Sequence, residues 1–386
     1  MSALSPLPAS FRAMLRNRVR AELEREGHDG LLVLDTWNVV YLSGFHHSPN
    51  ERPVGLWVPV AGEPILFVPF LEKEHAEEGH VADVLTYPEF PGETDPILWM
   101  IGECRARRLA IDDLPARLLA PGSDMVERLS LTDMVKRARH VKHPEELAFG
   151  RAAAGYADIC LEAIRRDLAA MVRDGLGEAA IMAHGVAAAT MALQRDHGAR
   201  LGATKLGVTA SVHSGPRGAL PHGKPLARVP LRGEPIIAGI GASVGGYHAE
   251  SGVTLVYGEP DADTLRCLEV ADAARRAAIA ALVPGARCDA VDRAARAIVV
   301  DAGLGAHLRH RIGHGMGVQG HEGPWLAPGD ATPVAPGMVF SNEPGIYRPG
   351  KDGYRTIETM IVTGDGVELP SRFQSTLTIA GRVIAA

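Results

Sequence analysis

Several features of membrane, secreted and nucleic-acid-binding proteins are missing from this sequence of 386 residues. No apolar run reaches the roughly 18 residues that span a bilayer, and the amino terminus has neither an apolar signal core nor a small-residue cleavage site. Basic residues form no block suited to a phosphate backbone, and acidic residues outnumber them, 46 against 40. We therefore expect a cytoplasmic protein that binds neither membranes nor nucleic acid.

Cysteine is scarce, and its four positions are far apart without any CxxC spacing. The cysteines are Cys104, Cys160, Cys267 and Cys288. They lie in apolar or helix-like neighbourhoods, which favours buried free thiols in a reducing compartment.

The first 135 residues alternate between helix-like and strand-like patterns. The expected elements are a helix at 10–27, buried strands at 31–34 and 39–42, a hairpin of 55–60 with 64–69, a helix at 71–79, a strand at 81–87, a helix at 95–106 and a strand at 109–111. This alternation predicts a smaller α/β domain over residues 1–135.

Residues 140–386 follow a different pattern, in which strand-rich and helix-rich stretches succeed one another. Pro144, followed by Glu145 and Glu146, marks the first turn of a long helix. We expect helices at 144–171, 178–196, 261–282 and 288–302, and strands at 208–212, 234–241, 246–255, 338–341, 356–363 and 376–379. The order predicts an antiparallel sheet covered by helices, and hence an α+β class.

Two histidines and two glutamates of interest lie close to one another late in the sequence. His314 and His321 lie in a glycine-rich stretch, which argues against a helix and favours a loop or short strand that brings both imidazoles into one pocket. Glu343 and Glu358 lie in otherwise apolar strands, where a carboxylate needs a cation, a proton or a substrate amine. Imidazole and carboxylate groups hold divalent metals or move protons near neutral pH.

These motifs, in this order, resemble the pita-bread hydrolases, the family of methionine aminopeptidases, Xaa-Pro aminopeptidases, prolidases and creatinase. The resemblance runs from Arg139 to the end of the chain. It is carried by Ser214-Gly215, Pro221-His222, Gly246-Tyr247, His314-Gly315, His321-Glu322 with Pro324, Glu343-Pro344-Gly345 and Glu358. The turn from Tyr41 to Phe45 resembles the amino-terminal domain of prolidase and creatinase. The resemblance implies a pita-bread catalytic domain over residues 140–386, preceded by a creatinase-type domain over 1–135.

The resemblance also implies metal-dependent hydrolysis with an altered ligand set. Metallopeptidases of the family hold two ions through two aspartates, one histidine and two glutamates. At the two aspartate positions this sequence has Gly239 and Glu250. Gly239 deletes the main ligand of one ion, so we expect at most one divalent ion, Mn, Zn or Co. Its implied ligands are Glu250, His314, Glu343 and Glu358.

Further site residues follow from the resemblance. The residues implied for catalysis are His222, His321 and Glu343, and those implied for substrate binding are Arg52, Arg355 and His213. Arg52 lies in a loop where creatinase-like enzymes place an arginine that reaches the partner subunit's site, which implies a homodimer. Arg355 stands three residues before Glu358, whereas the family usually places an arginine two residues before that glutamate.

Three functions are compatible with this sequence. The first is a hydrolase of the prolidase or Xaa-Pro dipeptidase type, which cleaves a C–N bond in a small peptide. The second is a metal-independent hydrolase resembling creatinase or ectoine hydrolase, in which His222 acts as the base and Glu250 or Glu358 grips a cationic carboxylate substrate. The third is a catalytically inactive member of the family that holds a peptide in the same cleft.

Overall fold

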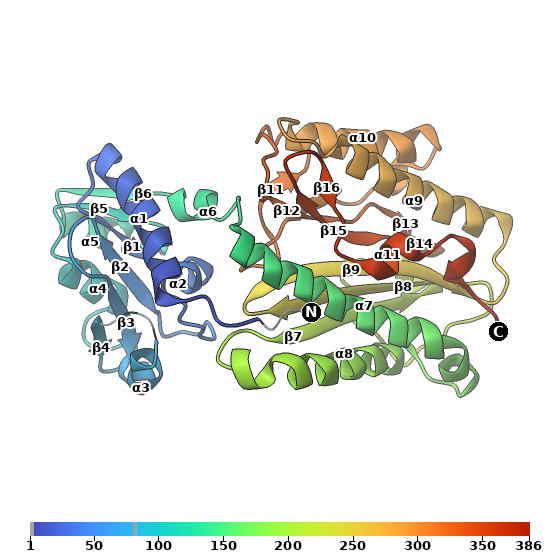
Figure 1. The fold of residues 1–386 in the computed structure, drawn as a ribbon, viewed down its shortest axis with the longest axis horizontal. Coiled ribbons are helices and arrows are strands. Elements are labelled where there is room, and N and C mark those ends of the chain that lie inside the picture. The colour runs from blue at the N-terminus through green and yellow to red at the C-terminus, as the bar shows by residue number, and fades with distance from the viewer. Residues whose placement is uncertain (1–3, 80, 82) are drawn as a thin grey trace. The chain divides into compact units, whose positions relative to one another are not determined.

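The computed structural model describes residues 4–79, 81 and 83–386. The chain forms two compact units, an amino-terminal one from Pro6 to Arg139 and a carboxy-terminal one built on His140–Ala386. Each unit combines helices with a sheet (Figure 1), which confirms the predicted α+β class. Residues 1–3 of the expected first domain, and Ala82 inside the strand expected at 81–87, lie outside the described residues.

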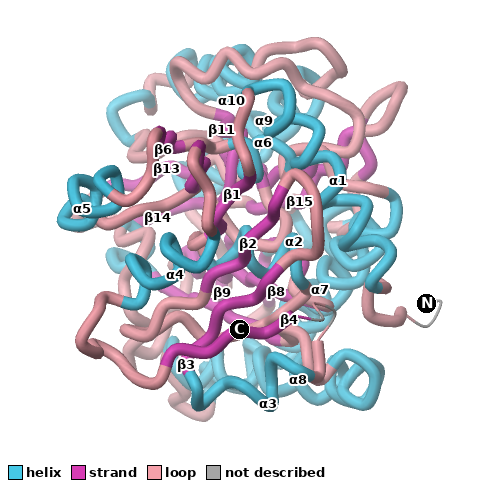
Figure 2. The backbone as a smooth tube through the Cα atoms, turned by 90° about the vertical axis from the view of Figure 1, so that its left-hand side faces the viewer, coloured by secondary structure: helices cyan, strands magenta, loops and turns pink. Residues whose placement is uncertain are grey.

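Over its described residues, the amino-terminal unit has a six-stranded sheet in the order β4-β3-β2-β1-β5-β6. Its strands are β1 Gly30–Val33, β2 Gly55–Pro59, β3 Ile65–Pro69, β4 Asp83–Tyr87, β5 Arg108–Ile111 and β6 Arg128–Leu131. Its helices are α1 Ala9–Glu26, α2 Thr36–Ser43, α3 Lys73–Glu77, α4 Pro96–Cys104, α5 Leu119–Asp124 and α6 Met134–Ala138. The predicted hairpin is confirmed as the antiparallel pair of β2 and β3, drawn in magenta in Figure 2.

The apolar run at 39–42 is helical, so the strand predicted there is wrong. Helix α2 begins after Asp35, whose carboxylate accepts the backbone N–H groups of Trp37 and Asn38 at 3.0 and 3.1 Å. This cap satisfies two N–H groups that a helix start otherwise leaves unpaired. Because residues 38–43 are all buried, the helix has no polar face that could reveal its period in the sequence.

Over the described residues from 140 onward, the carboxy-terminal unit has a nine-stranded sheet. The main order is β11-β10-β12-β15-β9-β8-β7, with β16 beside β15 and β17 beside β9. Its strands are β7 Gly207–Ser214, β8 Pro235–Val244, β9 Tyr247–Tyr257, β10 Gly313–Gly315, β11 Glu322–Leu326, β12 Val339–Asn342, β15 Ile357–Val362, β16 Val367–Glu368 and β17 Val383–Ile384. A separate hairpin joins β13 Gly345–Arg348 to β14 Asp352–Arg355. Except for β17 on β9, the neighbouring strands are antiparallel, as predicted.

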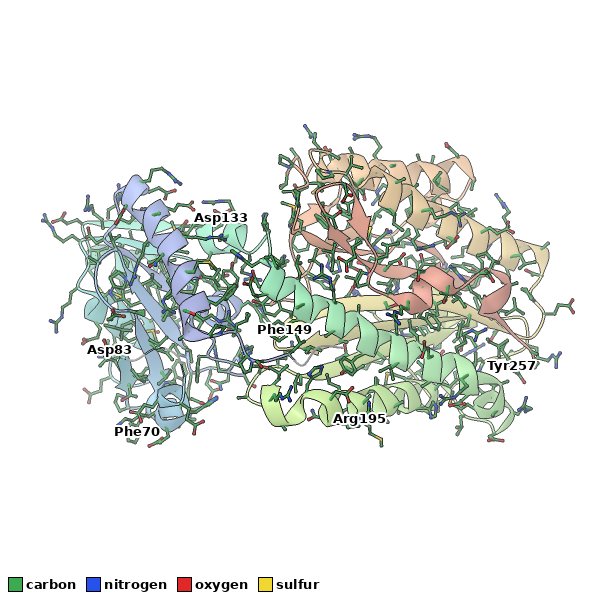
Figure 3. The ribbon with its side chains drawn as sticks, viewed as in Figure 1. Phe70, Asp83, Asp133, Phe149, Arg195 and Tyr257 are labelled. Carbon is green, nitrogen blue, oxygen red and sulfur yellow. The ribbon has the colours of Figure 1, made fainter. Side chains whose placement is uncertain are left out.

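Helices pack against this sheet in two groups (Figure 1). They are α7 Pro144–Arg173, α8 Glu178–Leu201, α9 Ala262–Ala281, α10 Cys288–Asp301 and α11 Arg372–Thr376. Helix α7 lies along β8 and β9, α8 packs on α7 and β7, and α9 packs on α10. Phe149 of α7, labelled in Figure 3, stacks on Tyr247 of β9 with ring centroids 5.6 Å apart. The sheet is thereby covered by helices, as the sequence predicted.

The strand predicted at 376–379 is also wrong, because helix α11 ends at Thr376 and the following residues are irregular. The Ser371 hydroxyl accepts the Gln374 N–H at 3.2 Å and caps this short helix. Asp158 on α7 accepts the N–H groups of Arg372 and Phe373 at 2.7 and 3.1 Å. These hydrogen bonds to α7 favour a helix here, and they outweigh the preference of the β-branched residues at 376–379 for a strand.

Two further expectations from composition concern the thiols and the membrane. All four cysteines are free and buried, as predicted. Burial raises the pKa of Cys160 and of Cys288 to about 12, so these thiols are protonated near neutral pH. Among the described residues, the length and apolarity needed to cross a membrane are found together in none of the helices.

Asp112, directly after β5, is a buried carboxylate in the amino-terminal unit. It accepts the Leu34 N–H and the Asn38 side-chain amide, each at 2.7 Å. Burial raises its pKa to about 6, although these hydrogen bonds favour the charged form. The folded chain therefore holds a proton on Asp112 that the unfolded chain releases at about pH 4.

This pKa shift predicts that Asp112 makes the amino-terminal unit less stable as the pH rises from about 4 to about 6, because the folded state binds the extra proton in that window. Asp112→Asn cannot titrate and should remove this slope, which amounts to up to about 3 kcal/mol. Urea unfolding of both proteins, followed by tryptophan fluorescence, measures the effect because Trp37, Trp57 and Trp99 lie in this unit. If the free energies of unfolding of the two proteins changed in parallel from about pH 4.5 to about pH 7, the prediction would be contradicted.

Candidate active site

A cavity of about 800 Å³ opens in the carboxy-terminal unit. Its ionisable lining residues are His222, Lys224, Glu250, Arg309, His310, Arg311, His321, Glu343 and Arg355. One lysine and three arginines thus share the cavity with two glutamates. Since lysine and arginine are charged at neutral pH, the cavity favours a ligand that carries an anionic group.

Two histidines and two glutamates form a cluster at this cavity. His314 on β10 is fully buried, and its Nε2 lies 3.4 Å from Glu343 Oε1 and 3.6 Å from Glu250 Oε2. His321, in the loop after β10, stacks on His314 with ring centroids 3.8 Å apart. Its Nε2 lies 3.6 Å from the other oxygen of Glu250. The structure therefore brings together four residues that the sequence singled out.

The glycines around His314 explain how this cluster forms. Strand β10 is hydrogen-bonded between β11 and β12. A Cβ atom on Gly313 would lie 2.0 Å from the Ser341 carbonyl oxygen, and one on Gly315 would lie 2.4 Å from that of Gly323. Only glycine fits at either position, so the short strand can pass between its neighbours and present His314 to the cavity.

In this cluster, the two carboxylates and the His314 imidazole shift one another's pKa values. Burial alone would raise the pKa of Glu343, but His314 and Arg355 outweigh burial and lower it. Burial likewise raises the pKa of Glu250, and contacts with His321 and His314 more than offset it. The same carboxylates raise the pKa of His314 against the effect of its burial. Both glutamates are therefore anionic near neutral pH and need a positive charge beside them.

The residues present fit one divalent ion. Ligand atoms of Glu250, His314 and His321 all lie within 4.8 Å of one another. Ligands of a tetrahedral zinc ion stand about 3.3 Å apart, close to the carboxylate–imidazole distances of this cluster. Within the described part of the chain, the buried Nε2 of His314 has Glu343 Oε1 and Glu250 Oε2 as its nearest charged neighbours and makes no hydrogen bond of good geometry, which suits an atom that could bind an ion. With Glu343 beside them, these ligands suit Mn, Zn or Co.

Glu358 does not lie with this group. Its side chain is fully buried, and Oε2 accepts a hydrogen bond from the Arg275 guanidinium of α9. Arg275 also pairs with Asp272 at 3.1 Å. The structure thus brings three of the four predicted ligands together and leaves Glu358 bound to an arginine. His321, predicted for proton transfer, stands with the ligand group instead.

Arg355 fills the space that Gly239 leaves open. A Cβ atom on Gly239 would lie 2.8 Å from Nη2 of Arg355. The Thr254 hydroxyl fixes the Arg355 backbone, accepting its N–H at 2.8 Å and donating to its carbonyl at 2.9 Å. Burial lowers the pKa of the Arg355 guanidinium, but Tyr347 and Glu343 outweigh burial and raise it. A permanent cation therefore lies where the resemblance placed an aspartate.

The remaining predicted residues have different surroundings. His222 is exposed and lines the cavity. His213 is buried and does not line the cavity; its Nε2 donates to the carbonyl of Gly223, the residue after His222. This contact makes His213 a support for the loop that carries His222. Arg52 lies in the amino-terminal unit, where its Nε donates to Glu89 at 2.9 Å, and its role in substrate binding stays a prediction.

Sequence reasoning missed Arg275 and His310, and it also missed the cationic cavity residues Lys224, Arg309 and Arg311. Arg275 lies among other charged residues on α9, and nothing in that pattern marks it as the partner of Glu358. His310 lines the cavity, and its Nε2 lies 2.9 Å from the Tyr347 hydroxyl. The proximity of His310 to His314 in the sequence could have identified it, because both belong to one histidine-rich stretch.

Comparison with known proteins gives matches over both units. The sequence matches the metallopeptidase family M24 at residues 150–364 and the creatinase/prolidase N-terminal domain at residues 16–121. It is 32% identical to the probable dipeptidase PepE of Mycobacterium tuberculosis, over 88% of this chain and 89% of that protein. It is 31% identical to the Xaa-Pro dipeptidase of Lactobacillus delbrueckii subsp. lactis, over 89% and 93%. The crystal structure of dipeptidase PepE from Mycobacterium ulcerans matches with a TM-score of 0.82 and 28% identity, over 99% and 100% of the two chains. These matches confirm the predicted two-part architecture.

The pairing of Arg275 with Glu358 predicts a large loss of stability when the arginine is removed. Arg275→Ala would leave Glu358 buried without a cation, which costs about 3–5 kcal/mol. Arg276→Ala is the matched control, because the Arg276 side chain is 62% exposed and its removal should cost less than about 1 kcal/mol. Urea unfolding followed by far-UV circular dichroism compares the two variants. Equal losses in both would show that Glu358 does not depend on Arg275.

Proposed function

Because the chain belongs to the metallopeptidase family M24, we propose that it hydrolyses the peptide bond of a small peptide of the Xaa-Pro dipeptide type. The observation that supports this proposal most is the cavity, in which the His–Glu cluster lies together with four cationic side chains. A volume of about 800 Å³ suits a small ligand rather than a polypeptide. The names of two relatives, a probable dipeptidase and an Xaa-Pro dipeptidase, point to the same substrate class.

The cationic residues bind the free carboxylate of the dipeptide in this proposal. Lys224, Arg309 and Arg311 line the cavity, and arginine binds a carboxylate through two parallel hydrogen bonds. Arg355 lies deeper, since only 7% of its surface is exposed, and faces an oxygen atom close to the reacting bond. Arg52 contributes from the partner subunit of a homodimer, as the resemblance implies.

Glu343 of the His–Glu cluster and His222 perform the proton transfers. One divalent ion held by Glu250, His314 and His321 would polarise the scissile carbonyl and lower the pKa of a bound water. Glu343 accepts the proton of the attacking water as the new C–O bond forms. His222, exposed in the cavity, donates a proton to the amine nitrogen as the C–N bond breaks.

A metal-independent hydrolase of the creatinase type is the second candidate. Gly239 has no ligand atom, Glu358 is bound to Arg275, and Arg355 supplies a permanent positive charge. In this alternative, His222 activates the water and Glu250 holds the cationic end of an amidine or amine substrate. Its substrates would be small cationic carboxylates in place of dipeptides.

Chelation separates these two candidates. If one ion supports the reaction, EDTA lowers the hydrolysis of Xaa-Pro dipeptides more than about 10-fold, and Mn, Co or Zn restores it. His314→Ala should abolish the restoration, because it removes a buried ligand. Hydrolysis is measured by release of free proline from a panel of dipeptides. Turnover that survives chelation and remains in His314→Ala would sink the metal-dependent mechanism and favour the second candidate.

A further inference from the structure

His321 is the most exposed member of the His–Glu cluster, and its position depends on the loop that carries it. Its side chain is 52% exposed, compared with 18% or less for the other three members. We propose that Lys142 is a positioning residue, which sets the place of His321 by pairing with Glu322, the next residue in the chain. The inference rests on the proposed function only in taking this cluster as part of the reaction site.

The loop that carries His321 has little rigidity of its own. It joins β10 to β11 and spans residues 316–321, of which Gly317 and Gly320 are glycines. Glycine gives the backbone more conformational freedom than any other residue. Within the loop, the Gly317 N–H donates to the Gln319 carbonyl at 3.1 Å. Contacts with the rest of the carboxy-terminal unit must therefore fix the shape of the loop.

The Glu322 carboxylate lies against the backbone of this loop. Its Oε2 accepts the Gln319 N–H at 3.4 Å, and a Cβ atom on Gly317 would clash with its Oε1. Glu322 also begins β11, where it is paired with Gly315 of β10. One side chain therefore contacts both the start and the middle of the loop that ends at His321.

Lys142 is the cation that holds this carboxylate. Its Nζ lies 2.8 Å from Glu322 Oε1, and the two side chains are only 3% and 5% exposed. The same Nζ donates to the His140 carbonyl at 3.3 Å, and the Lys142 backbone N–H donates to the Gly337 carbonyl at 2.9 Å. Both ends of the lysine are thus fixed. Because a buried carboxylate that loses its cation must find water or another donor, the place of Glu322 depends on Lys142.

His248 holds the same loop from β9. The Gly317 carbonyl accepts the His248 backbone N–H at 2.9 Å and its Nδ1–H at 3.0 Å. A Cβ atom on Gly320 would lie 3.7 Å from Cδ2 of this imidazole, so the ring also lies beside the second half of the loop. His248 stands two residues before Glu250 on β9. The strand that supplies Glu250 therefore also supports the loop that supplies His321.

His321 reaches the cluster only while this loop keeps its shape. Its ring stacks on His314 with centroids 3.8 Å apart, and its Nε2 lies 3.6 Å from Glu250 Oε1. A displacement of about 1 Å is enough to spoil the geometry of a reacting or ligating group. Lys142 does not line the cavity, so it acts on the cluster through Glu322.

Nuclear magnetic resonance of the histidine rings tests this proposal. The full-length protein is labelled with ¹³C-histidine and prepared without added metal, and the His321 signals are assigned from their loss in His321→Gln. Stacking on His314 shifts these signals away from the values of free histidine. In Lys142→Met we expect them to move to those values, because the ring leaves His314. Combining Lys142→Met with Glu322→Gln should restore at least part of the shift, because no buried charge is left unpaired and the amide can still accept the Gln319 N–H.

Two glycines of the loop supply a matched pair of variants. Gly317→Ala places a methyl group against the Glu322 carboxylate and 2.8 Å from Cε of Lys142, so it should displace the His321 signals as Lys142→Met does. Gly320→Ala is the control, because its methyl group would make only an ordinary contact and should leave the signals in place. This pair decides the question if Lys142→Met does not fold.

Unchanged His321 signals in Lys142→Met, no recovery in the double variant, or equal changes in Gly317→Ala and Gly320→Ala would overturn the proposal. The same change in Arg348→Met would also overturn it, since that variant breaks a buried ion pair with Asp352 in the β13–β14 hairpin and controls for lost stability alone. The signals are recorded without substrate. Failure to hydrolyse dipeptides would therefore refute the proposed function and leave this inference intact.

Discussion

Buried and half-buried carboxylates are the constraint on which the carboxy-terminal unit depends. Glu250 lies on β9, Glu358 lies on β15 and Glu343 directly follows β12, near the middle of the sheet, where an unpaired negative charge is costly. The structure meets this demand with His314 and His321 for Glu250 and Glu343, with Arg275 for Glu358, and with Arg355 inside the cavity. The chemistry of the site follows from this distribution of positive charge, because it decides how many positions remain for a metal.

The sequence predicted most of the fold because its clearest signals are local. Pro144 with two glutamates after it marks the start of α7, and turn residues separate β2 from β3. The errors arose where local signals compete with tertiary contacts. The run at 39–42 is buried on all sides, so its period could not distinguish a helix from a strand. The end of the chain is shaped by Asp158 of α7, which is far away in the sequence.

The candidate site was predictable to the extent that residue type implies chemistry. Histidines and glutamates in glycine-rich and apolar surroundings pointed to Glu250, His314, His321 and Glu343, and the structure groups them. Residue type alone did not reveal what the two arginines contact. Arg275 resembles any charged residue of a helix, and the fit of Arg355 to Gly239 depends on two strands that are distant in the sequence. Such pairs become visible only when the sheet is assembled.

The central claim is that Glu250, His314 and His321 form a site for one divalent ion. The most direct measurement is anomalous diffraction at the metal absorption edge from crystals soaked in Mn²⁺ or Zn²⁺. The account predicts a single anomalous peak among Glu250, His314 and His321, with the Arg355 guanidinium still seated against Gly239. Two peaks about 3.5–4 Å apart, as in two-metal hydrolases, would contradict it.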